Sequence, residues 1–258
     1  METDDDGFSP GQVVRAWHDM LEAGVSPADV TVLGFGGGPV SAFEYRMALA
    51  MGATVGLVDG LGGAAGDMLA DPLWASIPEL LPVPQDGRAL MALVGRPADG
   101  LASEVVELMA RDFHERYRQS NVHKVRPDTL RPWEALPETY RAASRAQATH
   151  AVRMLEQLGL QVRAGNGLSV PFAGLAAEEI DRLAEMEHGR WVIERLRDGW
   201  RPGPRDDAHK RHDCLVPWAE LKASRPDVAD LNRLAVVAFP DILRRAGLVV
   251  LRGPADAT

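Results

Sequence analysis

Two short, continuously apolar runs near the N-terminus constrain the fold of this chain more than any other feature. The first covers Val30 to Phe35 and ends in a glycine cluster; the second covers Thr54 to Val58 and ends at Asp59. Between them, Ser41 to Met51 shows the apolar spacing of a helix. Strands that are apolar throughout and alternate with helices are typical of a parallel sheet covered on both faces.

Further elements of the same kind flank these runs. Pro10 to Ala23 has helical spacing, with Ser9 as a suitable cap and proline at the first helical position. A second glycine-rich turn over Gly60 to Gly66 leads into a short helix. We expect a third strand over Arg88 to Val94. The sequence therefore predicts a small α/β, Rossmann-like N-terminal domain over residues 1–100.

The remainder of the chain is predicted to be mainly helical. We assign residues 101–252 to a second domain and residues 253–258 to a flexible tail. Loops are expected at Asn121 to Arg131, Gly165 to Pro171 and Gly199 to Asp213.

An internal repeat runs through the helical part, with copies at about 113–160 and 180–248. The offset between matching residues rises from 74 to 88 because the second copy carries insertions. The matching pairs are His114 with His188, Tyr117 with Trp191, Pro132-Trp133 with Pro217-Trp218, Ser144-Arg145 with Asn232-Arg233, and Gly159 with Gly247. Two copies of one unit usually pack about a pseudo-twofold axis, which leaves a cleft lined by equivalent residues.

Charge and composition exclude several classes of protein. The net charge is −9, and residues 1–100 alone carry −10, which argues against an extended nucleic acid as partner. No apolar stretch reaches the ~18 residues of a membrane helix, and no secretory signal is present. With Cys214 as the single cysteine, the sequence favours a cytoplasmic protein without disulfides.

The first glycine cluster has the composition of a phosphate-binding turn. Glycines let the backbone approach a phosphate, and the N-terminus of the following helix attracts anions. We predict that the turn uses Gly36, Gly37, Gly38 and Ser41, and that Asp59, at the end of the next strand, binds a ribose. The alternative is that these glycines only permit a tight turn.

The segment GGPVSAFE, from Gly37 to Glu44, resembles the G-G-x-G-T-x-x-E loop of the lonely-guy phosphoribohydrolases. Ser41 stands at the threonine position, and Val40 replaces the third glycine. The resemblance covers residues 28–96 and extends to the SLOG superfamily, which includes the Smf/DprA proteins and the cytosolic regions of melastatin-type channels. It implies binding of phosphate or ribose, and it makes Glu44 a candidate for hydrolysis; otherwise Glu44 is an acid that favours the helix N-terminus.

Aromatic and basic side chains gather in the window 184–248. Three of the six tryptophans, Trp191, Trp200 and Trp218, lie there among arginines and histidines. Aromatic faces beside guanidinium groups are suited to stacking a base and pairing with a phosphate. We expect Trp200 and Trp218 to be core residues and Trp191 to be the candidate for ligand contact.

The order of motifs from Ile180 to Leu248 resembles the ryanodine-receptor repeat (RyR) domain in its prokaryotic form. The motifs are MEHGRW, GWRPG, KRH, LVPW, LNR and a final AGL. The resemblance implies an adenine nucleotide stacked on Trp191, phosphates facing Arg195, and a hydrogen bond from Asn232. It also implies that Tyr117 and Ser144 are their counterparts in the first copy.

Together, the repeat and the resemblance predict one ligand-binding set. It consists of Tyr117, Ser144, Arg145, His188, Trp191, Arg195, Lys210, Asn232 and Arg233. For His188 the alternative is a structural residue that bonds Glu185 or Glu187. We expect no metal site, because no cysteine or carboxylate falls at a recognised ligand spacing around the histidines.

Three functions remain open. The first is a sensor that binds a nucleotide or a nucleotide-derived messenger (ADP-ribose-type or cyclic), in signalling or phage defence. It needs no cofactor, and it acts through a homo-oligomer or an effector protein. The second is a hydrolase of nucleotide N-glycosidic bonds that uses Glu44. The third is a protein-interaction module. No serine lies in a nucleophile elbow and no Walker loop is present, which favours the sensor over an enzyme.

Overall fold

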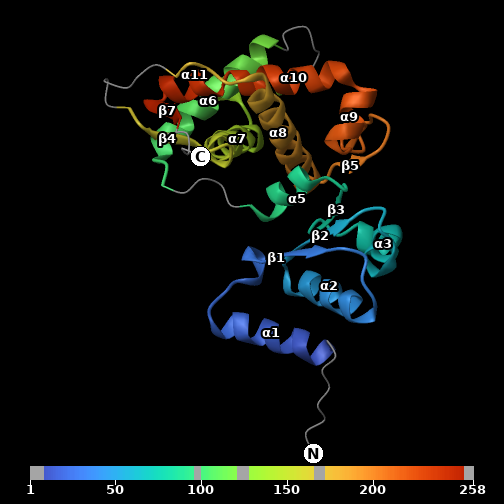
Figure 1. The fold of residues 1–258 in the computed structure, drawn as a ribbon. Helices are drawn as coiled ribbons and strands as arrows, with labels where there is room; N and C mark the ends of the chain where they lie inside the picture. The colour runs from blue at the N-terminus through green and yellow to red at the C-terminus, as the bar shows by residue number, and fades with distance from the viewer. Residues whose placement is uncertain (1–8, 96–99, 121–127, 166–171, 253–258) are drawn as a thin grey trace, which may run out of the picture. The chain divides into compact units, whose positions relative to one another are not determined.

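The computed structural model describes residues 9–95, 100–120, 128–165 and 172–252. The chain divides into two compact units, labelled by element in Figure 1. The first unit consists of residues up to 94 together with 191–221. The second consists of residues 95–190 together with those from 222 onward.

A three-stranded parallel sheet, in the order β1-β2-β3, forms the centre of the first unit. In register, Val32 of β1 lies opposite Val55 of β2, which lies opposite Leu80 of β3. The elements are α1 (Pro10–Glu22), η1 (Pro27–Asp29), β1 (Thr31–Gly34), α2 (Pro39–Met51), β2 (Thr54–Val58), α3 (Gly63–Ala70), α4 (Pro72–Ala75), β3 (Leu80–Val83) and α5 (Gly87–Val94). The predicted helices at α1 and α2 and the predicted strands at β1 and β2 are confirmed.

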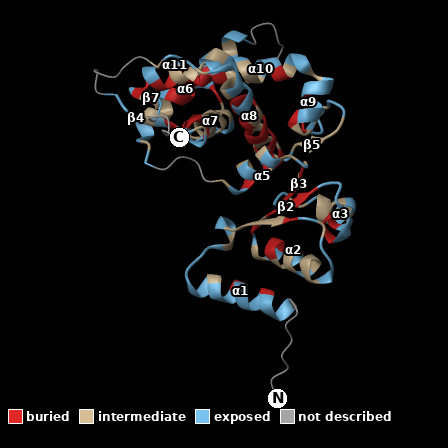
Figure 2. Ribbon diagram, viewed as in Figure 1, coloured by how far each residue is buried: buried red, intermediate tan, exposed pale blue. Residues whose placement is uncertain are grey.

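Each face of this sheet is covered by a different set of residues, because side chains alternate along a strand. Val55 and Leu57 pack into a buried cluster with α1, α2 and α3. Leu81 and Val83 pack into a second cluster on the other face. Gly56 points to that second face, where a Cβ would lie 2.3 Å from Leu93 Cδ2, so its missing side chain makes room for α5. Figure 2 shows β2 and β3 among the buried elements.

Residues 191–221 complete the second of these clusters. The end of α8 (Ala177–Arg197) supplies Val192, Ile193 and Leu196, and the loop that follows supplies Leu215. This segment also contains a short parallel pair, β5 (Arg201–Pro202) with β6 (Arg211–His212), and the start of α9 (Trp218–Ser224).

The predicted third strand over Arg88 to Val94 is wrong, because this segment is helix α5. A short apolar run does not distinguish a buried strand from a buried helix. Asp86 decides the outcome: its Oδ1 accepts hydrogen bonds from the N–H groups of Arg88 and Ala89, at 2.8 and 3.1 Å, which caps a helix. The third strand is β3, whose Pro82 is tolerated because β3 lies at the sheet edge.

The second unit is built from helices and one antiparallel strand pair. Its elements are α6 (Ser103–Ser120), η2 (Trp133–Ala135), α7 (Glu138–Gln157), β4 (Leu160–Ala164), α8 up to Arg190, α10 (Pro226–Val237), α11 (Phe239–Arg245) and β7 (Leu248–Arg252). Strands β4 and β7 pair with Val162 opposite Val250. Phe113 of α6 meets Phe239 of α11 edge to face, with ring centroids 5.4 Å apart.

Some predictions concern residues outside those that are described. These are the predicted tail at 253–258 and parts of the predicted loops at 121–131 and 165–171. The predicted domains stay a prediction; in the division into units, residues 191–221 join the first 94 residues. No helix among the described residues combines the length and the apolar character needed to cross a bilayer.

Asp86 caps two helices at once, which makes its removal costly. Besides capping α5, its Oδ2 accepts the N–H of Trp218 at 2.8 Å, at the start of α9. We expect Asp86→Ala to lower the free energy of unfolding by about 2 to 3 kcal/mol, measured by urea denaturation. Asp71→Ala removes a single cap bond, to Leu73 N, and should cost about 1 kcal/mol or less. Equal losses would contradict the double cap.

Gly63 tests the contact between the two glycine turns. It has φ +60°, and a Cβ there would lie 2.6 Å from the carbonyl oxygen of Gly37. We expect Gly63→Ala to destabilise the protein by at least about 1 kcal/mol, because both the backbone angle and the space exclude a side chain. Gly66→Ala, in the same helix with no atom within 4 Å of its Cβ, should stabilise by about 0.5 to 1 kcal/mol. Thermal unfolding of both variants distinguishes the two effects.

Candidate functional site

The glycine turn between β1 and α2 packs directly against the glycine turn after β2. The carbonyl oxygens of Gly36 and Gly37 accept hydrogen bonds from Ala65 N and Ala64 N, at 2.8 and 2.9 Å. These two amides lie at the start of α3, so they are already bonded to protein. Positive φ angles of +58° and +90° at the two glycines make this approach possible.

The other residues predicted for phosphate binding lie around this turn. A Cβ on Gly37 would lie 2.5 Å from Ser41 Cβ, so the turn and the first turn of α2 are in contact. Burial raises the pKa of Tyr45, and a hydrogen bond with Ser41 offsets part of this rise. Asp59 is exposed at the end of β2, and Glu44 is half-buried on α2. The sequence therefore placed these residues correctly near the ends of β1 and β2.

A second group of candidate side chains comes from residues 191–212. We use the name aromatic cluster for Trp191, Trp200 and His212. The His212 ring lies edge-on to Trp191, with centroids 5.0 Å apart, and 5.9 Å from Trp200. Trp191 and Trp200 also pack against the buried cluster of β3 and α5, which fixes their positions.

Three cations surround the aromatic cluster. The Arg205 guanidinium lies 5.5 Å from the Trp200 ring centroid, in cation–π contact. Arg195 lies one helical turn after Trp191 on α8, so both side chains are on the same face of the helix. Lys210 Nζ and Arg195 Nη1 lie 3.5 and 3.7 Å from the two carboxylate oxygens of Asp198. Arg195 and Lys210 were both predicted as ligand contacts. Asp198 lies near both, and Arg195 pairs more closely with Glu194, at 2.6 Å.

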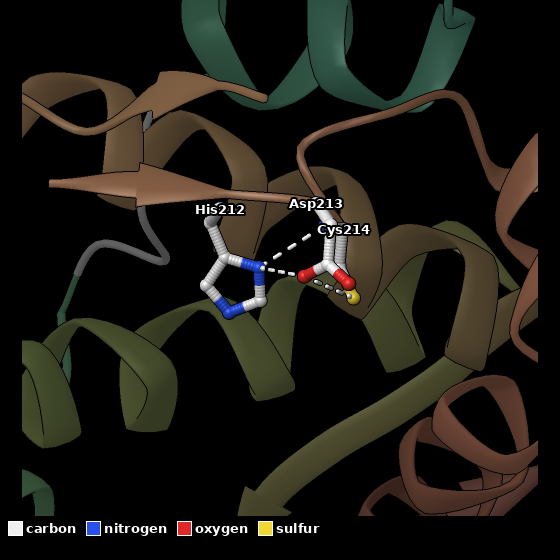
Figure 3. Close-up of side chains that lie close together, drawn as sticks. All are labelled: His212, Asp213 and Cys214. Carbon is white, nitrogen blue, oxygen red and sulfur yellow. Dashed lines mark hydrogen bonds and ion pairs between the residues drawn. The ribbon is translucent and has the colours of Figure 1, made fainter. Parts of the chain in front are cut away.

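His212 is held by the two residues that follow it (Figure 3). Its Nδ1 accepts the backbone N–H of Cys214 at 3.1 Å and lies 3.2 Å from Asp213 Oδ1. An imidazole, a carboxylate and a thiol within 4.8 Å of one another are donor types that suit a zinc-like ion. We assign no ion here, because Nδ1 already accepts a hydrogen bond and the Arg205 guanidinium beside Nε2 opposes a cation. The arrangement instead fixes the orientation of the His212 ring in the aromatic cluster.

The segment MEHGRW is mostly buried. Glu187, His188 and Arg190 are 4, 2 and 7% exposed. Glu187 and Arg190 form two hydrogen bonds of 2.8 Å, and Gln147 Nε2 donates to the same carboxylate at 2.8 Å. The burial of His188 favours the structural alternative for this residue. Of the six residues in the motif only Trp191 is half-exposed.

The remaining predicted ligand contacts lie in the second unit, each with a protein partner. Ser144 Oγ donates to Tyr140 O at 3.1 Å, and Asn232 Nδ2 donates to Val228 O at 3.1 Å. Tyr117 is 39% exposed. Ionic partners hold the two arginines: Arg145 pairs with Glu107 and Glu138, and Arg233 pairs with Asp181 and Asp230. The predicted cleft that joins these residues to Trp191 stays a prediction.

The ligand-binding set predicted from the sequence leaves out four members of this site: Trp200, His212, Asp198 and Arg205. Trp200 packs against the core, as expected, but it is only half-buried and its Nε1 donates to Asp198 Oδ2 at 3.1 Å. Trp218, by contrast, is buried as expected. Asp198 and Arg205 carried no motif signal. The available signal was their closeness in the sequence to the Gly199-Trp200 turn.

The comparison with known families agrees with this location. A family model described as the RyR domain matches residues 173–233, which include all of α8, β5, β6 and α9 and part of α10. Over these residues the C-terminal part of the chain is similar to the RyR domain. Among curated proteins, none matches the chain.

Arg201 links the site to the sheet, and this link can be tested. Its guanidinium donates to the carbonyl oxygens of Leu196, Trp200 and Leu80, at 3.3, 3.0 and 3.4 Å. Arg201→Met should lower the free energy of unfolding by about 1 to 3 kcal/mol, because three carbonyl groups lose a charged donor. Arg211→Met, at an exposed position of β6, should change it by less than about 0.5 kcal/mol. Similar effects in guanidinium denaturation would contradict this role of Arg201.

Proposed function

We propose that the protein binds a nucleotide or a nucleotide-derived messenger at the aromatic cluster. In this proposal the base stacks on Trp191, and Arg195 and Lys210 pair with phosphate. One observation carries it: residues 191–212 gather two indoles, an imidazole and three cations in one place. Rings supply stacking that tolerates different bases, and arginine supplies charge-assisted hydrogen bonds.

We favour the aromatic cluster over the glycine turn for physical reasons. At the glycine turn, the amides that start α3 already donate to Gly36 and Gly37. A phosphate at the amides that start α3 would compete with these backbone bonds, which leaves only the N-terminus of α2 for an anion at this turn. At the aromatic cluster the cations are also paired, Arg195 with Glu194 and Lys210 with Asp198, but the rings add a stacking surface that the glycine turn lacks.

The second unit supports a proposed internal repeat with pseudo-twofold symmetry. Gly159 matches Gly247 in the sequence, so Val162 of β4 corresponds to Val250 of β7. These two residues lie opposite each other in the antiparallel pair. Leu160 pairs with Arg252, which is the equivalent of Ala164. Ala164 pairs with Leu248, which is the equivalent of Leu160. If the two copies are exchanged, the same residue pairs result. This is the pairing expected for a twofold axis that passes between Val162 and Val250.

We further propose that the N-terminal sheet is a reduced Rossmann-like domain of the SLOG superfamily. The parallel order β1-β2-β3, with a glycine turn between β1 and α2, supports this relation. On this proposal the protein is a cytoplasmic sensor in signalling or phage defence. Ligand binding would then be passed to an effector protein or to a second copy of the chain.

Substitution of Trp191 tests the binding proposal. Calorimetry with ADP, ADP-ribose and cyclic AMP measures affinity for wild type, Trp191→Ala and Trp191→Phe. Loss of one stacked base should weaken binding roughly 5- to 150-fold in the alanine variant, which corresponds to about 1 to 3 kcal/mol. Phenylalanine keeps a ring and should lose less. Circular dichroism establishes that each variant is folded.

Trp74→Ala is the matched control, because Trp74 is a half-buried tryptophan with Arg46 5.6 Å from its ring. It lies in the first unit and outside the aromatic cluster, so its loss should leave affinity unchanged. Binding that is equal in wild type and Trp191→Ala would overturn the proposed site. If none of the three nucleotides binds the wild type, the proposed function fails.

A further inference from the structure

The two edge strands of the N-terminal sheet, β1 and β3 (Figure 1), differ in how open they are to a further strand. An edge strand presents N–H and C=O groups with which another chain can pair, so proteins usually protect such edges. At β3 the outward groups belong to Leu80 and Pro82, and they are mostly occupied. Leu80 donates to Ile77 O at 3.1 Å, and its own carbonyl oxygen accepts from Arg201 at 3.4 Å. Pro82 has no N–H to offer.

The opposite edge, β1, has no such protection. Thr54 N–H donates to Val30 O at 3.1 Å, so the backbone groups of Val30 and Val32 point toward β2. Because the direction of these groups alternates along a strand, the N–H and C=O groups of Thr31 and Leu33 point to the free edge. Among the described residues, none forms a hydrogen bond with these four groups.

The composition of β1 is that of an inner strand. Residues 30–34, with the sequence VTVLG, contain neither a charged residue nor a proline, the usual means of blocking an edge. Val32 and Leu33 pack against the clusters on opposite faces of the sheet, yet both stay half-exposed. Val55 and Leu57 of β2, which has a neighbour on each side, are fully buried. A strand beside β1 would bring it closer to that state.

We infer that β1 is an interface at which a second copy of the chain pairs through its own β1. The two strands are antiparallel, about a twofold axis at Val32. In this register Val32 lies opposite Val32 of the second copy, and Thr31 lies opposite Leu33. Each pair of Thr31 with Leu33 exchanges two N–H···O bonds, so all four outward groups of each copy are used. This interface goes beyond the proposed function, because it does not require a nucleotide.

Side chains and charges fit this pairing. Opposite residues of an antiparallel pair share a face, so two valines meet on one face and Thr31 meets Leu33 on the other. The charged residue nearest to β1, Asp29, comes opposite Phe35, so like charges do not meet across the strands. The combined sheet has β3 at both outer edges, where Pro82 and Arg201 already protect it. The edge therefore fits a second copy and is closed by it.

The first experiment measures the dimer without nucleotide, by light scattering and sedimentation equilibrium. About 0.3 M sodium chloride screens the repulsion between two chains of net charge −9. We expect wild type to be mainly dimeric at about 100 µM, a concentration suited to a small interface. Thr31→Pro removes an outward N–H from each copy, so it should weaken the dimer at least about tenfold. Val30, with φ −91° and ψ 133°, is already compatible with a following proline. Thr31→Val keeps the N–H and should keep the dimer.

A second measurement keeps the test decisive if Thr31→Pro does not fold. Val32→Cys places two thiols at the axis, with Cα atoms about 4.5 Å apart, which a disulfide can span. We expect diamide to convert this variant to a covalent dimer. Thr31→Cys is the matched control, because its two Cα atoms would lie more than about 7 Å apart, too far for a disulfide. The natural Cys214 is buried, and wild type measures its background.

The outcomes decide the inference separately from the proposed function. A monomeric wild type overturns the inference. It is also overturned by a dimer that a folded Thr31→Pro leaves unchanged, or by equal cross-linking of Val32→Cys and Thr31→Cys. These results leave nucleotide binding at Trp191 untouched. Conversely, if calorimetry finds no nucleotide bound, the proposed function fails and a dimer cross-linked through Val32→Cys still stands.

Discussion

The packing of residues 191–221 against β3 and α5 is the interaction on which the candidate site depends. Val192, Ile193 and Leu196 are almost fully buried against Leu81 and Val83 of the sheet. This apolar contact fixes the end of α8, and therefore the positions of Trp191 and Arg195. Asp86 adds a polar connection, since one carboxylate caps helices that are distant in the sequence. The site is built on a rigid hydrophobic base rather than on an isolated loop.

Much of the N-terminal sheet could be predicted because its signals are local. The strands β1 and β2 are continuously apolar and end in glycines, and α2 between them has a helical period. The third strand was missed because its evidence is not local. Pro82 lowers the strand signal of β3, while the apolar run of α5 reads equally well as a strand. Only the capping bonds of Asp86 and the space left by Gly56 settle the conformation of α5.

The candidate site was predicted in part, for a similar reason. Trp191, Arg195 and Lys210 could be found from motif order. The participation of Trp200 depends on a turn that places its indole N–H on Asp198, which no periodicity reveals. His188 shows the converse case: a polar residue within a recognisable motif suggests ligand contact, while its burial favours the structural alternative. Its burial beside the Glu187–Arg190 pair shows that motif residues can serve the interior of a domain.

The composition of the first unit has a consequence for synthesis on the ribosome. The sheet face formed by Leu81 and Val83 is made about 110 residues before Val192 and Ile193 are available to cover it. At translation rates of about 5 to 20 residues per second, this face waits roughly 5 to 20 seconds in the nascent chain. During that interval α5 covers part of this face, and the part that Val192 and Ile193 later cover is an exposed apolar surface on a partly folded domain. Such a surface is a binding site for chaperones and a starting point for aggregation, so the yield of folded protein is sensitive to the speed of translation between the two segments.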